Sequence, residues 1–336
     1  MPFRKKYASS TDVARLAGVS QSAVSRVYKT GASVSQTTRQ KVLAAARELD
    51  YRPSAIPRIM LTHRSNLVAV VIGGLYNPLY AAILERFSIR LQEAGHQVLL
   101  VHVDSGHSLD AAIPRLVSYR VDAIVSALSV LQPQSAEELA RLRIPVVAFN
   151  TVANNDWVSS ICCDNINAAR EIASHLLARG AKRLEYISGP ADSPANQERL
   201  AGFSSLLAER GVTHVQAVGD SYDYETGYAA AVEVLNRPDP PDALFCANDL
   251  LAIGAIDAIR KEMRLQVPGD VLVAGFDDIP AASWASYNLT TFVQDGMRMV
   301  DAAMDILQTS AASREPAGNV RVVVPARLVE RGSTRR

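Results

Sequence analysis

Residues 11–27 read TDVARLAGVSQSAVSRV, and this stretch predicts two short helices that pack on each other. Apolar residues fall at Val13, Leu16 and Ala17, and then at Val24 and Val27. At helical spacing, these positions would form two faces that share one small core.

A tight turn, Gly18-Val19-Ser20, separates the two expected helices. A glycine just past a helix favours a left-handed cap, and Ser20 can accept a hydrogen bond from the free amides of the next helix. Two helices joined in this way form a helix-turn-helix, whose second helix can enter the major groove of DNA. The alternative is an ordinary helical hairpin in a core, which the polar outer face makes less favourable.

The second helix carries polar side chains where a recognition helix would meet base edges. Glutamine pairs best with adenine, serine is permissive, and arginine can make a bidentate contact with guanine. Arg26 could equally bind a phosphate. We expect the DNA contacts of this helix to come from Ser20, Gln21, Ser22, Ser25 and Arg26.

The overall net charge of +1 conceals a strong asymmetry. Residues 1–65 contain twelve Lys and Arg against three Asp and Glu, a balance of +9, and the remaining chain carries −8. A basic head on an acidic body is typical of a DNA-binding module attached to a separate domain.

After the two-helix motif, Ser35 is the expected N-cap of a third helix with apolar positions at Val42, Leu43, Ala46 and Leu49. The segment SAIPRIML, residues 54–61, follows. It is too short to form a stable isolated helix, so it is either a plain linker or a helix that forms only when something packs on it.

From residue 67, short apolar runs alternate with longer amphipathic segments, which predicts parallel sheets covered by helices on both faces. The alternation is too long for one sheet and indicates two doubly wound lobes with a cleft between them. The expected strands are residues 67–72, 97–103, 122–127, 145–149, 183–188, 214–218, 242–246, 270–276 and 320–325. The expected helices are residues 78–94, 165–179, 195–210, 223–236 and 249–263.

Polar side chains follow several of these strands, at the sheet edges where ligands bind in open parallel sheets. Amides, a carboxylate and an arginine suit a polyhydroxylated ligand, because each hydroxyl needs donors and acceptors. Leu79, Tyr80, Tyr222 and Tyr224 could supply flat apolar walls. For Asn77, Asn248 and Asp278, helix capping is an equally strong interpretation. The polar positions are Asn77, Asn150, Arg199, Asn248, Asp277 and Asp278.

The composition argues against several other classes. Three cysteines, two of them adjacent, fit reduced thiols in a cytoplasm, and the six histidines show no ligand spacing, so we expect neither a disulfide nor a metal. No export signal or membrane span is evident.

A transporter's solute-binding protein would share the lobes but needs an export signal. Catalysis is disfavoured because no dinucleotide fingerprint, Walker loop or nucleophile elbow occurs.

The whole chain from about Thr11 to Ser333 resembles the LacI-type transcription regulators, the family of the lactose and purine repressors. TDVARLAGVSQSAVSRV and VPGDVLVAGFDDIPAA carry the most specific similarity, supported by YRPSAIPR and RLVERGS. The resemblance implies a homodimer whose paired heads read a near-palindromic operator, and a periplasmic-binding-protein-like body. No leucine-rich tail that could join dimers into tetramers follows the final strand.

By position, the resemblance assigns Gln21, Ser22 and Arg26 to the recognition contacts. In the family, residues 53–65 would form a hinge helix whose leucine wedges into the minor groove; here Met60 stands at that position, beside Leu61. The expected DNA contacts are Thr11, Ser20, Gln21, Ser22, Ser25, Arg26, Arg58, Met60 and Leu61.

The resemblance assigns Asn150, Arg199, Asn248 and Asp277 to the effector. With the aromatic walls added, the expected effector contacts are Tyr80, Asn150, Arg199, Tyr222, Asn248 and Asp277. Asn150 replaces an aspartate found in several sugar-binding members, which with Arg199 favours an acidic ligand such as a sugar acid. The segment around Tyr222 is one residue longer than the usual spacing.

The sequence therefore predicts a cytoplasmic, nucleoid-associated transcriptional regulator, most simply a repressor, controlled by a small-molecule effector and needing no cofactor. We expect a helix-turn-helix head at residues 1–52, a linker at 53–65 and a body at 66–336. Its lobes would be residues 66–162 with 293–317, and 163–292 with 318–333.

Overall fold

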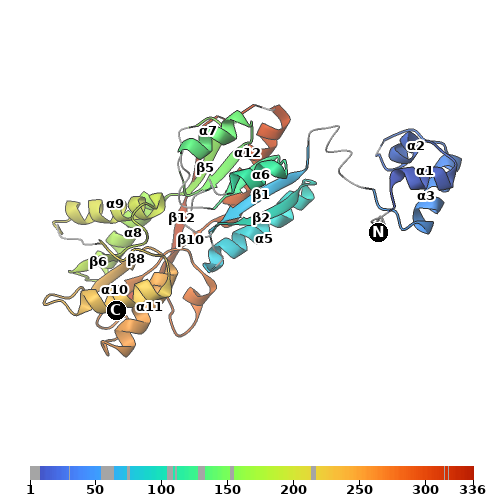
Figure 1. Cartoon of the computed structure of the whole chain (residues 1–336). Coiled ribbons are helices and arrows are strands. Elements are labelled where there is room, and N and C mark those ends of the chain that lie inside the picture. The colour runs from blue at the N-terminus through green and yellow to red at the C-terminus, as the bar shows by residue number, and fades with distance from the viewer. Residues whose placement is uncertain are drawn as a thin grey trace, which may run out of the picture. The chain divides into compact units, whose positions relative to one another are not determined.

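The computed structural model of the 336-residue chain forms two units, Met1–Ser65 and Asn66–Arg336 (Figure 1). The division falls where the sequence places the start of the body. The structure describes residues 8–29, 31–53, 64–73, 76–103, 109, 112–127, 133–151, 155–212, 217–313, 315–316 and 318–336.

The described part of the first unit contains three helices: α1 (Ser10–Ala17), α2 (Gln21–Val27) and α3 (Gln36–Glu48). The predicted signals for helix ends are confirmed. Gly18 ends α1 in the left-handed region with φ 64°, and the side chains of Ser20 and Ser35 cap α2 and α3. Local backbone chemistry therefore sets the turn of the helix-turn-helix.

The core of the head differs from the prediction at one position. Leu16 is 47% exposed, whereas its neighbour Ala14 is buried. At about 100° per residue, Leu16 lies about 100° around α1 from the middle of the buried stripe, so it falls on the flank of the helix. In the described part of the head, the buried hydrophobic residues are Val13, Ala14, Val24, Val27, Val42, Ala45 and Ala46.

The first lobe of the second unit is built on a six-stranded parallel sheet of order β11-β5-β4-β3-β1-β2. Its strands are β1 (Leu67–Ile72), β2 (Gln97–His102), β3 (Ala123–Ser126), β4 (Val146–Phe149), β5 (Val158–Cys163) and β11 (Arg321–Val324). One core, which includes Phe87 and Met299, lies under α5 (Pro78–Glu93) and α12 (Gly296–Ser313). A second core, which includes Leu116 and Leu139, lies under α6 (Ile113–Ser118) and α7 (Pro133–Arg141). The sheet is thus covered on both faces, as a doubly wound lobe requires.

The second lobe has a four-stranded parallel sheet of order β7-β6-β8-β9. Its strands are β6 (Leu184–Ile187), β7 (Ala217–Val218), β8 (Ala243–Cys246) and β9 (Leu272–Ala274). Its helices are α8 (Asn165–Ala178), α9 (Pro194–Glu209), α10 (Tyr224–Leu235), α11 (Asp249–Lys261) and the 3-10 helix η2 (Pro280–Ser283). A Cβ at Gly227 would lie 2.1 Å from the carbonyl oxygen of Leu251, so glycine permits the close packing of α10 on α11.

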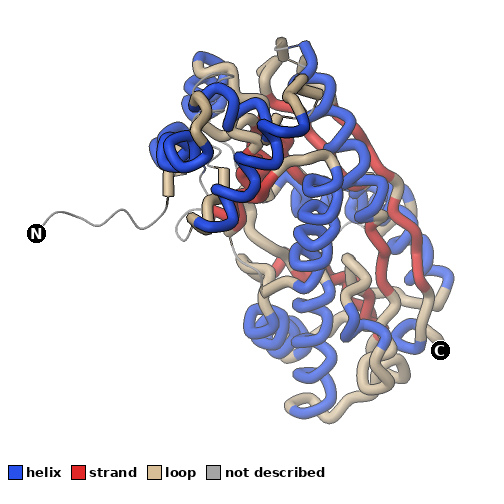
Figure 2. Tube along the Cα trace, turned by 90° about the vertical axis from the view of Figure 1, so that its right-hand side faces the viewer, coloured by secondary structure: helices blue, strands red, loops and turns tan. Residues whose placement is uncertain are grey.

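An antiparallel pair, β10 (Thr291–Gln294) and β12 (Ala326–Val329), lies between the lobes and is followed by the 3-10 helix η3 (Gly332–Thr334) (Figures 1 and 2). The chain passes from one lobe to the other after β5, after β10 and after β11. The expected assignment of residues 318–333 to the second lobe is wrong for β11, which pairs with β5 in the first sheet.

The predicted α/β alternation is confirmed, and each expected strand and helix overlaps an observed one. Three strands (β5, β10 and β12) and three helices (α6, α7 and α12) have no counterpart in the sequence-based assignment. Residues 214–216 of one expected strand, and residues 54–63 of the expected linker, lie outside the described residues.

Candidate functional site

The head presents the predicted recognition residues on its surface. Thr11 on α1 and the polar residues of α2 are exposed, while Val24 and Val27 on the opposite side of α2 are buried. Within this surface, Gln21 Nε2 donates to Ser10 Oγ at 3.0 Å and Arg26 Nε donates to the carbonyl oxygen of Ser22 at 3.3 Å. The predicted contacts Arg58, Met60 and Leu61 lie outside the described residues.

The basic side chains of the head are also exposed, which gives the surface of a nucleic-acid-binding module. They belong to all three helices and to the segments that follow them. Those in the described part of the head are Arg15, Arg26, Lys29, Arg39, Lys41, Arg47, Arg52 and Arg64.

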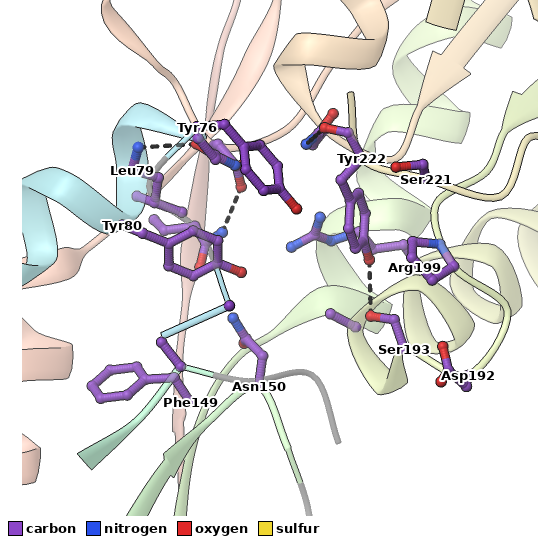
Figure 3. Close-up of a pocket in the computed structure, with 18 of the residues that line it drawn as sticks. Tyr76, Leu79, Tyr80, Phe149, Asn150, Asp192, Ser193, Arg199, Ser221 and Tyr222 are labelled. Carbon is purple, nitrogen blue, oxygen red and sulfur yellow. Dashed lines mark hydrogen bonds between the residues drawn. The ribbon is translucent and has the colours of Figure 1, made fainter. Parts of the chain in front are cut away.

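A cavity of about 310 Å³ lies between the two lobes of the second unit (Figure 3). All six residues expected to contact an effector line it, although no two of them come from the same helix or strand. The remaining lining residues are Gly73, Tyr76, Asn77, Leu79, Ala127, Phe149, Pro190, Asp192, Ser193, Ala195, Asp220, Ser221 and Gln294. The volume is at the lower end of the range for small-molecule sites, so a ligand of about sugar size fits.

Arg199, on α9, supplies the positive charge of the cavity and is 3% exposed. Its Nε atom donates to Asn165 Oδ1 at 2.9 Å, its Nη1 atom donates to the carbonyl oxygen of Ala247 at 2.5 Å, and its guanidinium carbon lies 3.7 Å from the ring centre of Phe276. These contacts hold the guanidinium group in place, and it points into the cavity (Figure 3). No described residue accepts a hydrogen bond from Nη2, which leaves this donor for a ligand.

Asp277 lies after β9 and is buried, with a left-handed backbone at φ 119°. Its two carboxylate oxygens accept from Asn77 Nδ2 at 2.9 Å and from Gln294 Nε2 at 2.7 Å. Burial raises the pKa of Asp277, while the positive charge of Arg199 and the two hydrogen bonds act in the opposite direction. The bond from Asn77 links the first lobe to the second, so Asp277 belongs to the contact between the lobes as well as to the cavity.

Asn150 directly follows β4, has φ 53° and presents its amide group to the cavity. Its Oδ1 atom accepts from the backbone N–H of Cys163 at 3.2 Å. Because only the oxygen can accept from an N–H, this bond fixes the orientation of the amide and leaves Nδ2 as a donor that faces the ligand space (Figure 3).

The aromatic walls come from both lobes. Tyr76 and Tyr80 lie on the first-lobe side and Tyr222 on the second-lobe side (Figure 3). Tyr222 shares a hydrogen bond of 2.9 Å with Ser193 through its hydroxyl, whereas the hydroxyl of Tyr80 has no partner in the described part of the chain. Burial raises the pKa of both tyrosines, so both hydroxyls are protonated and can donate.

The capping interpretation is correct for two of the three doubtful residues. Asn77 accepts from the backbone N–H of Leu79, and Asn248 accepts from the backbone N–H of Leu251, so they cap α5 and α11. The amide of Asn248 also donates to the carbonyl oxygen of Tyr222, which occupies both ends of that side chain. Asn248 therefore shapes the cavity through its neighbours.

Two expected positions do not line the cavity. Asp278 pairs with Arg331 at 2.7 Å. Tyr224 donates to Asp257 at 3.0 Å on α11 and supplies no wall. Conversely, sequence reasoning missed Tyr76, Asp192, Ser193, Asp220, Ser221 and Gln294. Asp192 and Ser193 lie in the loop after β6, and Asp220 and Ser221 lie in the loop after β7; for these four residues, that position after a strand was the available signal.

No helix among the described residues has the length and apolarity needed to cross a membrane. Within the same residues, no group of three or more His, Cys, Asp or Glu side chains could hold a metal ion.

A helix-turn-helix head together with a two-lobed body and an interlobe cavity defines a DNA-binding transcriptional regulator. Comparison with known proteins agrees. Residues 11–54 match the model of the bacterial regulatory proteins of the lacI family, and residues 173–334 match that of the periplasmic binding protein-like domain. The chain belongs to the lacI family.

Relatives match over their full length. The HTH-type transcriptional repressor CytR of Escherichia coli (strain K12) is 30% identical over 343 residues, covering 100% of this chain and 99% of that protein. The ribose operon repressor of the same organism is 30% identical, covering 97% and 99%. Catabolite control protein A of Priestia megaterium is 28% identical, covering 96% and 98%.

Solved structures of transcriptional regulators also resemble this chain over nearly its full length. The lac repressor dimer bound to operator and the anti-inducer ONPF has a TM-score of 0.85 at 29% identity, covering 98% of this chain and 99% of that chain. The complex of the transcriptional regulator CelR with cellobiose has a TM-score of 0.72 at 30% identity, covering 97% and 99%. A solute-binding protein of a transporter is not favoured, because the first match covers the DNA-binding head.

Proposed function

We propose that the protein is a homodimeric repressor whose affinity for operator DNA is controlled by a small polyhydroxylated acid bound in the interlobe cavity. The convergence of the six predicted residues on one cavity carries this proposal. The protein acts in the cytoplasm at the nucleoid, as a regulator rather than an enzyme, and without a cofactor.

The charge of the effector follows from the groups that the cavity leaves unused. Arg199 Nη2, Asn150 Nδ2 and the hydroxyl of Tyr80 are donors without partners among the described residues. The carboxylate of Asp277 already accepts from two amides. A donor-rich interior suits a ligand rich in acceptors, and a carboxylate beside Arg199 would gain charge-assisted hydrogen bonds.

The rim of the cavity supplies the opposite chemistry. Asp192 and Asp220 are exposed lining residues of the second lobe, and their carboxylates can accept hydrogen bonds from hydroxyl groups. A sugar acid presents both features, with a carboxylate for the interior and hydroxyls for the rim. The related CelR structure contains cellobiose, a neutral sugar, so a preference for an acid would distinguish this site from that one.

The homodimer is proposed from a related structure, and several large apolar side chains of the body are exposed and available to a partner copy. Ile89 on α5 is 52% exposed, Leu100 on the edge strand β2 is 48% exposed, and Trp284 is 59% exposed. The related lac repressor structure is a dimer.

Effector control requires two states with different affinities for the effector. Ligand that contacts both lobes favours their closed arrangement, and it can change operator affinity only by its differential affinity for the two arrangements, typically about 1–3 kcal/mol. The three passages of the chain between the lobes are where such a motion would be absorbed.

Two measurements test the proposal. A thermal-shift screen over sugars, sugar acids and purines should find a sugar acid that raises the melting temperature, because binding to the folded state stabilises it. Selected operator fragments should then bind in a manner that weakens steeply with salt, as released counterions require. Stabilisation by neutral sugars alone would contradict the assigned charge, and equal binding to random DNA would contradict the repressor.

A further inference from the structure

A chain of hydrogen bonds leads from the cavity arginine to the other lobe. Arg199 Nε donates to Asn165 Oδ1 at 2.9 Å. Asn165 Nδ2 in turn donates to Glu198 Oε2 at 2.9 Å. The second oxygen of Glu198, Oε1, accepts from Arg321 Nη2 at 2.6 Å. Asn165 and Glu198 each bind one neighbour on either side, so the four side chains form a continuous relay.

The middle of the relay is rigid. Asn165, at the first turn of α8, is 1% exposed, and both ends of its amide are engaged. Arg199 can only donate and a carboxylate can only accept, so the amide of Asn165 has one orientation that satisfies both. A movement of Glu198 is therefore transmitted to the Nε–H of Arg199 through a buried group that has no other partner in the described residues.

The outer end of the relay joins the two lobes. Glu198 lies on α9 in the second lobe, whereas Arg321 begins β11, the edge strand of the first sheet. Arg321 lies four residues before Pro325, where the chain passes from β11 to β12. The ion pair thus lies beside one of the three passages between the lobes, where a change in lobe angle alters the distance between its members.

We propose that Glu198 and Arg321 form an interlobe latch, and that Asn165 couples this latch to the orientation of Arg199. Glu198, Asn165 and Arg321 are positioning residues, since none of the three lines the cavity. The functional meaning of the relay rests on the effector site proposed above. By reciprocity, a ligand that draws Arg199 toward it changes the strength of the latch, and opening the latch changes the affinity of Arg199 for ligand.

The experiment uses the full-length protein without ligand or DNA, so that it does not depend on the identity of the effector. The first variant is Arg321→Gln, which removes the charge in the first lobe and leaves Asn165 and Arg199 intact. One readout is the hydrogen-exchange rate of the Arg199 Nε–H by NMR, with the resonance assigned from an Arg199→Lys sample. We expect an increase of about two- to fivefold, the range produced by a half-exposed ion pair worth up to about 1 kcal/mol.

The second readout is the distance between spin labels on the two lobes. Cysteines replace the exposed residues Glu137 on α7 and Glu233 on α10, and labelled protein is diluted into an excess of unlabelled protein. The three native cysteines are buried, which limits their labelling. Arg321→Gln should broaden the distance distribution.

Arg170→Gln is the matched control. Arg170 pairs with Glu209 at 2.8 Å, again an arginine with a glutamate of α9, but both residues lie in the second lobe. This variant should change neither readout. The latch would be refuted if Arg321→Gln changed neither the exchange rate nor the distance distribution. It would also be refuted if Arg170→Gln changed them as much as Arg321→Gln does.

The reversed pair, Glu198→Arg with Arg321→Glu, separates the latch from the relay. It restores an interlobe ion pair but removes the acceptor of Asn165 Nδ2. In this double variant, we expect the spin-label distance distribution of the wild type. We expect the Arg199 Nε–H to exchange as rapidly as it does in Arg321→Gln, and the protein still to melt cooperatively. Restored exchange protection would refute the coupling through Asn165.

Discussion

Asn77 Nδ2 donates to Asp277 Oδ2 at 2.9 Å, and this bond spans 200 residues of sequence to join the start of α5 to the loop after β9. The same asparagine uses its oxygen to cap α5. One side chain therefore holds a helix end in the first lobe and fixes the carboxylate that the second lobe contributes to the cavity. The two roles can be separated by mutation.

Asn77→Ser keeps an oxygen able to cap α5, because serine and asparagine are about equally good N-caps, but it removes the amide donor. Asn77→Ala removes both. We expect Asn77→Ala to be less stable than Asn77→Ser by about 1 kcal/mol in chemical unfolding. Both should weaken binding of the best sugar acid from the screen to a similar degree. Full binding by Asn77→Ser would show that the bond to Asp277 does not position the carboxylate.

A second prediction concerns pH. Asp249, the residue after the cavity-lining Asn248, is fully buried. It accepts from the hydroxyl of Thr291 at 2.5 Å and the backbone N–H of Ile279 at 2.9 Å. Burial of the carboxyl is the larger cause that raises the pKa of Asp249 well above the ordinary value of 3.8, and the negative charge of Asp277 raises it further. A carboxyl with a raised pKa binds its proton more tightly in the folded state, so its contribution to stability is lost as pH rises from about 3.8 through the folded pKa.

Asp249→Asn removes this titration while keeping the size of the side chain. The melting temperature of the variant should therefore fall less than that of the wild type as pH is raised from about 4 toward neutrality. Asp305→Asn, at an exposed position on α12, is the control and should follow the wild type. Parallel curves for the wild type and Asp249→Asn would mean that Asp249 titrates normally.

The elements that could be predicted from the sequence are those set by local chemistry. The left-handed Gly18 and the capping Ser20 and Ser35 act within one turn of their own position, so their signals are contained in a few neighbouring residues. The apolar strands and amphipathic helices of the body carry a periodicity that is independent of their partners.

The missed elements depend on distant partners. β5, VSSICC, is entirely buried although it includes two serines, and its place in the sheet comes from pairing with β4 and β11, the latter about 160 residues later. β10 and β12 are short strands that pair with each other between the lobes. In the cavity, the donor role of Asn150 follows from its bond to Cys163, which no sequence pattern contains.

Asn150→Asp tests the donor role directly. An aspartate keeps an oxygen for the N–H of Cys163 and replaces the donor Nδ2 by a second acceptor. We expect the affinity for the sugar acid to fall by at least about tenfold, because a carboxylate would face an anion at the cost of a hydrogen bond. Neutral sugars should bind no worse than in the wild type. Equal losses for acidic and neutral ligands in calorimetric titrations would contradict the proposed charge preference.

The last prediction separates DNA recognition from effector binding. Arg26 is exposed on α2, and its only described hydrogen bond is the long one to the carbonyl oxygen of Ser22, so its guanidinium group is available to DNA. Arg26→Ala should weaken operator binding by about 1–3 kcal/mol in fluorescence anisotropy, the usual value of a specific arginine contact.

If Arg26 reads a base, the loss should be larger for the operator than for random DNA. If it binds a phosphate, both should weaken alike with a smaller salt dependence. Arg141→Ala, at an exposed position of α7 in the body, is the control. Thermal shift with the sugar acid should be unchanged in Arg26→Ala, and a parallel loss of DNA and effector binding would refute the division of labour between head and body.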